Sequence, residues 1–309
     1  MKKLLFLILF IPILVSAQDF TGEIIYEIKI IPKSDTANLK KIMELKNGTV
    51  LSYLLTSKQY KSTYSKEGRY KYSYTYDPKT RRLYDDFSHK PYMTYRDSRK
   101  SLIQYYGAEV YKDSTATILD HDCYLMESKS QQGTTRAYYA KNLKVNYANY
   151  EGHNAGNWYE KLKMVDGAIP LRTITEHETY TEVIQAVKIV ERKVSDKEFK
   201  PVQKKPVVAS FSVLDQPAEV LTTSPDQAKC YQDKVNAMSN EDGEEYTSMI
   251  VFLLTSKGEV RYVAPYGRND DYYVTAADII NNCGFDFKPG KIAGKPVDSQ
   301  VFFPVNFLK

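Results

Sequence analysis

Between residues 21 and 199 the chain is a succession of strand-like runs separated by short polar segments, and this pattern limits the fold more than any other feature. The first run, TGEIIYEIKII at 21–31, consists largely of residues that favour strands. Only the segment 34–48 is compatible with a short helix, and it reads equally well as a polar loop. The pattern therefore predicts one large curved antiparallel sheet or a half-open barrel with little helix. Further runs of this kind occupy 51–65, 70–87, 116–130, 134–142 and 169–195.

Tyrosine is unusually frequent, with 27 residues, and its densest patch is RYKYSYTY at 69–76. The period of two predicts that the rings of Tyr70, Tyr72, Tyr74 and Tyr76 share one face of a strand. A turn at Asp77 and a returning strand, RRLYDDF, follow. The four rings are a candidate surface for a ligand or a partner. The alternative is a sheet face whose tyrosines pack together and keep their hydroxyl groups hydrated.

The first 17 residues have the features of a secretory signal peptide. Lys2 and Lys3 precede an apolar run, and small residues end at Ala17, as signal peptidase requires. The apolar run is shorter than the roughly 20 residues that span a bilayer, so we expect cleavage after Ala17. The sequence thus predicts export to a periplasm, with a retained membrane anchor as the alternative.

Charge and cysteine content exclude some classes of protein. The chain has 43 Lys and Arg against 38 Asp and Glu, and the two signs are interspersed. Such a balance lacks the basic footprint of a nucleic-acid-binding protein. The three cysteines form no Cys-x-x-Cys pair, and an odd number leaves at least one thiol unpaired within the chain.

Four segments of the first part of the chain follow one another in a recognisable order. They are DFTGEIIYEI at 19–28, ILDHDCYLMES at 118–128, RAYYAKNL at 136–143 and GAIPLRTI at 167–174. This order resembles exported proteins of the GLPGLI type and the wider LolA/LppX-like lipoprotein-carrier fold, over about residues 19–200. The resemblance implies a sheet curved around an apolar cavity that holds acyl chains or other hydrophobic ligands.

The last third of the chain has a different organisation. Residues 200–210, KPVQKKPVVAS, predict an extended and solvated linker. Ser224 and Gln227 form a capping box, with proline at the first helical position, and begin a helix. A hairpin follows at 246–267, and then a helix that Thr275 would cap with Asp278 as its partner. With a final strand at 298–307, the predicted order is helix, strand, strand, helix, strand.

Three segments carry a second resemblance, to the TonB C-terminal domain family over about residues 224–309. They are VFLLTSKGEV, AADIINNCGFDFKPG and GKPVDSQVFFPVNF. In energy transducers of this family the domain contacts an extended segment of an outer-membrane receptor, partly by adding a strand to a sheet edge. The family fold also places both helices on one side of the sheet, so that a disulfide between Cys230 and Cys283 is compatible with it and Cys123 would be a buried thiol. By analogy, the partner-binding residues are Gln300, Val301, Phe302, Phe303, Pro304, Val305, Asn306 and Phe307.

The sequence contains no pattern that predicts catalysis. None of the histidines His89, His121, His153 and His177 belongs to an HExxH motif, and GxSxG, Walker A and GxGxxG patterns are missing. The cluster around His121, Asp120-His121-Asp122, is more typical of a turn than of a metal site. We therefore expect no catalytic residue, no metal and no cofactor.

These observations together predict an α+β protein with a signal peptide at 1–17, a strand-rich domain at 18–199, a linker at 200–210 and a TonB-like domain at 211–309. The expected function is that of a non-enzymatic periplasmic binding or adaptor protein. Its TonB-like domain would bind an envelope protein that presents an extended segment, and its strand-rich domain would hold a lipid or another apolar ligand. Two alternatives remain open at this point: an energy-transducer component retained at the inner membrane, and a hydrolase or metal-dependent enzyme in the first domain.

Overall fold

The fold is known from a computed structural model of the chain, which describes residues 19–34, 48–201, 204–221, 223–238, 246–266 and 271–307. The expected signal peptide and its cleavage point lie outside these residues. Most of the segment 34–48, predicted as a short helix or a loop, also lies outside them.

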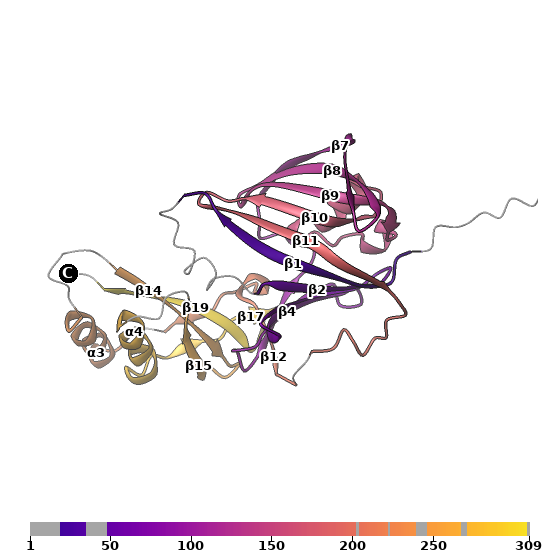
Figure 1. Cartoon of the computed structure of the whole chain (residues 1–309). Helices are drawn as coiled ribbons and strands as arrows, with labels where there is room; N and C mark the ends of the chain where they lie inside the picture. The colour runs from indigo at the N-terminus through magenta and orange to yellow at the C-terminus, as the bar shows by residue number, and fades with distance from the viewer. Residues whose placement is uncertain are drawn as a thin grey trace, which may run out of the picture.

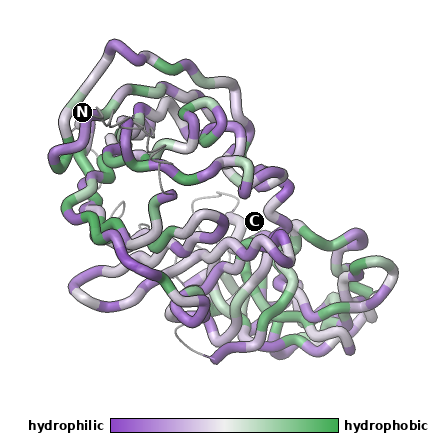
Figure 2. Tube along the Cα trace, turned by 90° about the vertical axis from the view of Figure 1, so that its right-hand side faces the viewer, coloured by the Kyte–Doolittle hydropathy of each residue, from purple (hydrophilic) through white to green (hydrophobic). Residues whose placement is uncertain are grey.

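Most described strands belong to one open sheet of 15 strands, in the order β15-β14-β19-β12-β6-β5-β4-β3-β2-β1-β11-β10-β9-β8-β7. Nearly all neighbours pair antiparallel, and little helix interrupts the series from β1 to β11, so the prediction of a large antiparallel sheet is confirmed. In Figure 2 hydrophobic and hydrophilic stretches follow one another along the trace. Along most of β1 the burial of the side chains alternates between neighbouring residues, as expected for a sheet with faces of different exposure. The strands of the sheet are β1 Gly22–Pro32, β2 Val50–Leu55, β3 Tyr60–Lys66, β4 Arg69–Asp77, β5 Arg82–Phe87, β6 Met93–Asp97, β7 Tyr105–Ile118, β8 His121–Ser130, β9 Gly133–Lys144, β10 Ala168–Glu176, β11 Tyr180–Glu191, β12 Val207–Ala209, β14 Tyr246–Leu254, β15 Val260–Pro265 and β19 Ser299–Phe307.

Short helical segments cover the first part of the sheet. Tyr150, of the 3-10 helix η1 (Tyr147–Tyr150), and Leu162, of α2 (Trp158–Met164), belong to the same buried cluster as the sheet residues Ile24 and Leu55. A second 3-10 helix, η2 (Ala155–Asn157), connects them. Side chains of the segment 147–164 therefore cover part of this face of the sheet.

The tyrosine strand β4 contains a β-bulge that changes the predicted face of one ring. Tyr64 pairs with Tyr72, but the next residue of β3, Ser65, pairs with Tyr70, so Lys71 has no partner of its own. Directly paired residues share a face of the sheet, and Tyr64 and Ser65 point to different faces. The side chain of Tyr70 therefore lies on the opposite face of the sheet from that of Tyr72. Its hydroxyl donates to the carbonyl oxygen of Asp86 at 2.8 Å. The expectation that all four rings share one face therefore fails for Tyr70.

The predicted linker differs from the expectation of a solvated segment. The Lys61 ammonium group donates to the carbonyl oxygen of Lys200 at 2.7 Å, and Lys205 forms a buried ion pair with Asp86 at 2.8 Å. Residues 207–209 then form β12, which pairs parallel with β6 and, at Ala209, with the first residue of β19. Two side-chain anchors and a strand thus hold most of the segment 200–210 against the sheet.

The last part of the chain contains α3 (Pro225–Asn236), β14, β15, α4 (Asp271–Asn282) and β19, in this order. Its strands continue the large sheet through β12, and Figure 1 shows them at the end of the molecule away from β7, β8 and β9. A core that includes Ile279 of α4, Phe252 of β14 and Val305 of β19 joins the helices to one face. The remaining elements are η3 (Phe211–Val213) and two small two-stranded sheets, β13 (Glu219–Val220) with β16 (Phe287–Lys288) and β17 (Lys291–Ile292) with β18 (Lys295–Pro296).

Helix α4 begins earlier than the capping pattern predicted. It already includes Asp271, so Thr275 lies inside the helix and is not its cap. The ring of Tyr272 packs between Tyr246 and Phe307, with centroids 4.3 and 5.0 Å away. These contacts stabilise an additional helical turn, which outweighs the local preference of threonine for a cap.

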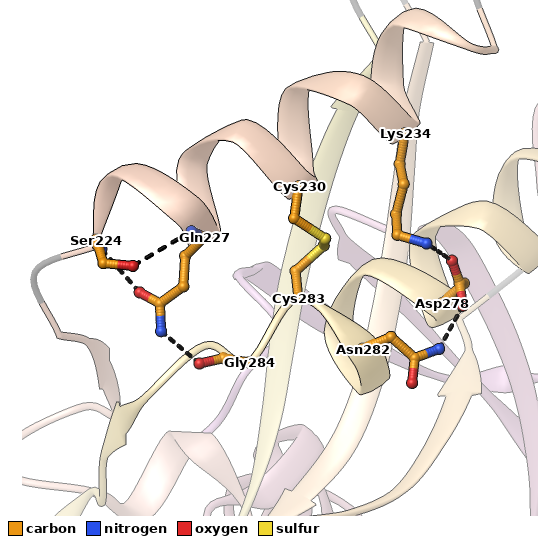
Figure 3. Close-up of a disulfide and its surroundings, with 8 residues drawn as sticks. All are labelled: Ser224, Gln227, Cys230, Lys234, Asp278, Asn282, Cys283 and Gly284. Atoms are coloured by element: carbon orange, nitrogen blue, oxygen red, sulfur yellow. Dashed lines mark hydrogen bonds and ion pairs between the residues drawn. A yellow bond between two sulfur atoms is a disulfide. The ribbon is translucent and has the colours of Figure 1, made fainter.

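The two helices are joined by a disulfide between Cys230 and Cys283, which the close-up in Figure 3 shows with its surroundings. Beside it, the capping box of Ser224 and Gln227 is complete, with both reciprocal hydrogen bonds present. The third cysteine, Cys123, is a free buried thiol in β8.

Candidate partner-binding site

Strand β19 is paired along only one of its two edges. Its pairing with β14 runs without interruption from Ser299 opposite Leu254 to Phe307 opposite Tyr246. On the other side it pairs with β12 at Ser299 alone, because the chain leaves the sheet after Ala209 and forms η3. Among the described residues, no strand pairs with this outer edge beyond Ser299. β19 is thus an interior strand where it begins and an edge strand over the rest of its length.

Hydrogen bonds show which backbone groups point to the outer edge. The N–H and C=O groups of Asn306 both bond to the Tyr231 hydroxyl, at 3.3 and 3.2 Å, so they point away from β14. The direction alternates along an antiparallel strand, so the groups of Phe302 and Pro304 point outward too. The carbonyl oxygen of Asp298, which accepts from Ala209, fits the same alternation.

This orientation explains a proline inside a long strand. Pro304 has no N–H, but its position faces the outer edge, so the ladder with β14 loses no hydrogen bond. Among the described residues, no hydrogen bond to the N–H of Phe302 is found. An unpaired backbone edge of this kind is a template for an additional strand.

An apolar groove of about 630 Å³ lies beside the unpaired edge. Its lining includes Val301 and Phe302 of β19, and Leu214 and Pro217 of the segment between η3 and β13. Met249 of β14 also lines the groove. The edge and the groove together offer backbone hydrogen bonds and apolar contacts at one place.

Exposed aromatic rings surround Phe302. Its ring meets those of Phe211 and Tyr266 edge to face, with centroids 5.3 and 4.8 Å away. Phe211 is 53% exposed and Tyr266 is 59% exposed. Aromatic side chains are enriched at protein interfaces, and a cluster of them on a surface marks a binding site more often than single exposed residues do.

A strained residue is connected to the groove through Tyr92 and Gln300. Tyr262 of β15 has a φ of 56°, a left-handed conformation that is rare for a bulky residue, and a β-bulge interrupts the pairing with β14 there. Such strain costs about 1–3 kcal/mol and is found most often at functional sites. The bulge directs the ring of Tyr262 toward Tyr92, with centroids 6.2 Å apart, and Tyr92 accepts a hydrogen bond from Gln300 at 3.4 Å.

The predicted tyrosine surface is not part of this site. Tyr72 and Tyr76 are buried, and burial raises the pKa of both hydroxyl groups. The hydroxyl of Tyr72 donates to Asp85 at 2.5 Å, and the ring of Tyr76 stacks on His153 with 4.1 Å between centroids. Tyr76 belongs to a buried apolar cluster and the half-buried Tyr74 packs against it, whereas Tyr72 stacks on Phe87 with 4.3 Å between the centroids.

The sequence pattern located the final strand but missed four residues of the site. None of these residues belongs to a sequence motif, and their roles depend on contacts with β19 or on the bulge in β15. They are Phe211, Tyr231, Tyr262 and Tyr266. No signal in the local sequence distinguishes them from the other tyrosines and phenylalanines.

Two further observations concern metal sites and membrane-spanning helices. No three His, Cys, Asp or Glu side chains of the described residues lie together in a way that could hold a metal ion. No helix within the same residues is long and apolar enough to cross a membrane.

Comparison with known proteins assigns no family. No family model matches the chain, and no curated protein matches it. The structure of PNGF-II is 11% identical to this chain, with a TM-score of 0.36. The match covers 94% of this chain and 64% of PNGF-II, so this chain spans less than two thirds of the length of PNGF-II. A weak structural similarity, with 9% identity and a TM-score of 0.20, relates 59% of the chain to 91% of a putative outer membrane lipoprotein-sorting protein domain from Vibrio parahaemolyticus. Both TM-scores are too low to support a functional inference.

Proposed function

We propose that this protein is a non-enzymatic binding or adaptor protein of the bacterial periplasm. Its outer β19 edge would bind an extended segment of an envelope protein by strand addition. The observation that carries this proposal is the outward-facing N–H and C=O of Phe302 beside an apolar groove. Strand addition needs free backbone groups on a sheet edge for affinity, and pockets beside it for side chains.

Two further features support the proposal. The order α3, β14, β15, α4, β19 and the segments 251–260, 276–290 and 294–307 resemble the TonB C-terminal domain family, whose domains bind extended segments. The leader-like sequence at 1–17 supports export to the periplasm.

The strand-rich part of the chain contributes less to the proposal. An apolar ligand between the sheet and the segment 147–164 would have to displace Tyr150 and Leu162, which belong to the largest apolar cluster. The groove beside β19 needs no such displacement. We therefore assign recognition of the partner protein to β19. We propose the binding of a lipid by the strand-rich part only as a secondary role.

Photo-crosslinking in cells tests the proposal. A photoreactive phenylalanine analogue at Tyr266 would face the groove, and the same analogue at Val274, which is 61% exposed on α4, is the matched control. We expect a discrete crosslinked protein from position 266 and none from position 274. Equal crosslinking at both positions, or none at position 266, would contradict the proposal.

A backbone test then separates strand addition from simple apolar contact. Phe302→Pro removes an outward N–H and leaves the pairing with β14 intact, whereas Phe302→Leu keeps this N–H. Because the loss of one hydrogen bond costs about 0.5–1.5 kcal/mol and the proline ring also obstructs the edge, Phe302→Pro should reduce crosslinking at least severalfold. Phe302→Leu should retain most of it. An equal loss in both variants would indicate that the ring of Phe302, and not its backbone, binds the partner.

A further inference from the structure

The unpaired stretch of the β19 edge is blocked at both ends. At the beginning of the strand, β12 pairs with Ser299. Near its end, the Tyr231 hydroxyl accepts a hydrogen bond from the N–H of Asn306 and donates one to its carbonyl oxygen. One tyrosine side chain thus occupies both backbone groups that Asn306 directs outward.

The position of Tyr231 is restrained by its surroundings. It lies in α3 directly after Cys230, whose disulfide ties this helix to Cys283 at the end of α4. Its ring meets that of Phe285 edge to face, with 6.3 Å between the centroids. A restrained hydroxyl is a more effective block than a mobile side chain, because a competing strand would have to move the helix or break both hydrogen bonds.

Between these two ends only a short stretch remains for pairing. Gln300 also directs its C=O outward, directly next to the β12 contact at Ser299. Beyond it, the groups that point outward are the N–H and C=O of Phe302 and the C=O of Pro304, which has no N–H. Outward groups recur every second residue, about 6.8 Å along an extended strand. The open stretch therefore accommodates only about three residues of an added strand in register.

We propose that Tyr231 determines the length of the segment that this site accepts. This inference rests on the proposed function. The bound polypeptide pairs through about three residues opposite Phe302, Phe303 and Pro304, and then ends or leaves the sheet before it reaches Asn306. Its residue opposite Phe302 is apolar, because directly paired side chains share a face and that face carries Phe211. Tyr231 thereby favours short extended segments with an apolar anchor over long β-strands.

Displayed peptides of five randomised residues, flanked by glycine and serine, are a suitable probe. Binders are selected on the full-length protein, and those that lose binding to Phe302→Pro are retained. Each retained peptide is then extended by Thr-Val-Thr at either end. Its dissociation constant is measured for the wild type, for Tyr231→Phe and for the control Tyr272→Phe. The control removes a hydroxyl that has no hydrogen-bond partner among the described residues, near the same end of β19.

The wild type and Tyr272→Phe should gain less than about twofold in affinity from either extension. Tyr231→Phe should gain roughly tenfold from the extension that reaches Asn306, since two backbone hydrogen bonds become available. Amide exchange at Asn306 should also accelerate in this variant, which keeps the ring contact with Phe285.

The outcomes separate this inference from the proposed function. If peptides bind through the Phe302 backbone but all three proteins gain equally from extension, the role of Tyr231 is refuted and strand addition stands. If no selected peptide is sensitive to Phe302→Pro, strand addition at β19 is refuted, and the role of Tyr231 with it.

Discussion

Acid should destabilise this protein through His153, a histidine that is completely buried. Its Nε2 lies 2.8 Å from the Tyr60 hydroxyl and its Nδ1 lies 3.4 Å from the carbonyl oxygen of Ser98. A carbonyl oxygen only accepts, so the neutral ring donates from Nδ1 and accepts at Nε2. Burial disfavours the charged imidazolium and lowers the pKa of His153 to about 4, with the nearby Arg96 acting in the same direction.

The size of the effect follows from linkage. An unfolded histidine has a pKa of about 6.5, so the pKa difference of about 2.5 corresponds to about 3 kcal/mol. Between these two values the unfolded chain binds a proton that the folded chain does not bind. The contribution of His153 to stability is therefore fully present above about pH 6.5, falls as the pH drops toward 4, and changes no further below it.

Urea unfolding measured by tryptophan fluorescence is the appropriate assay. Trp158 is the single tryptophan, and its ring centroid lies 6.4 Å from that of His153. The control is His153→Gln, whose amide can both donate and accept but does not titrate in this range. Carboxylates also titrate near pH 4, and subtracting the variant removes their common contribution.

The free energy of unfolding of the wild type relative to His153→Gln should fall by about 3 kcal/mol between pH 7 and pH 4. A difference that stays constant over this range would refute the assignment of His153 as a buried neutral base. A fall that occurs only below pH 4 would indicate titration of carboxylates instead.

Two further perturbations test how the last part of the chain is held. Replacing Cys230 and Cys283 by serine removes a covalent link across 53 residues and should lower the free energy of unfolding by about 4 kcal/mol in the loop-entropy model. Urea unfolding followed by circular dichroism measures this loss, and unchanged stability would contradict the pairing. Lys205→Met leaves Asp86 buried without its charged partner and should cost about 3–5 kcal/mol, whereas the double variant with Asp86→Asn should recover most of this loss. If the single and double variants unfold at the same urea concentration, this ion pair does not anchor the segment 200–210.

The differences between prediction and structure have identifiable physical causes. Alternation in RYKYSYTY predicted a strand correctly, but the bulge at Lys71 that turns Tyr70 to the other face arises from pairing with β3. A local capping pattern placed a helix start at Thr275, whereas ring contacts of Tyr272 with neighbouring strands extend the helix. The composition of 200–210 indicated a solvated linker, but the buried partner of Lys205 is more than 100 residues away in sequence.

The sequence by itself determined the features that depend on neighbouring residues: the strand periodicity of β1 to β5 and of β8 to β11, the capping box at Ser224 and the final strand β19. It did not predict β6 or most of β7. These features arise from side-chain period, turn chemistry and capping, which act within a few residues. Only the tertiary structure decided that β19 keeps one edge open and that Tyr231 occupies part of it. Those properties depend on which distant segments lie beside the strand, and a local pattern carries no information about such neighbours.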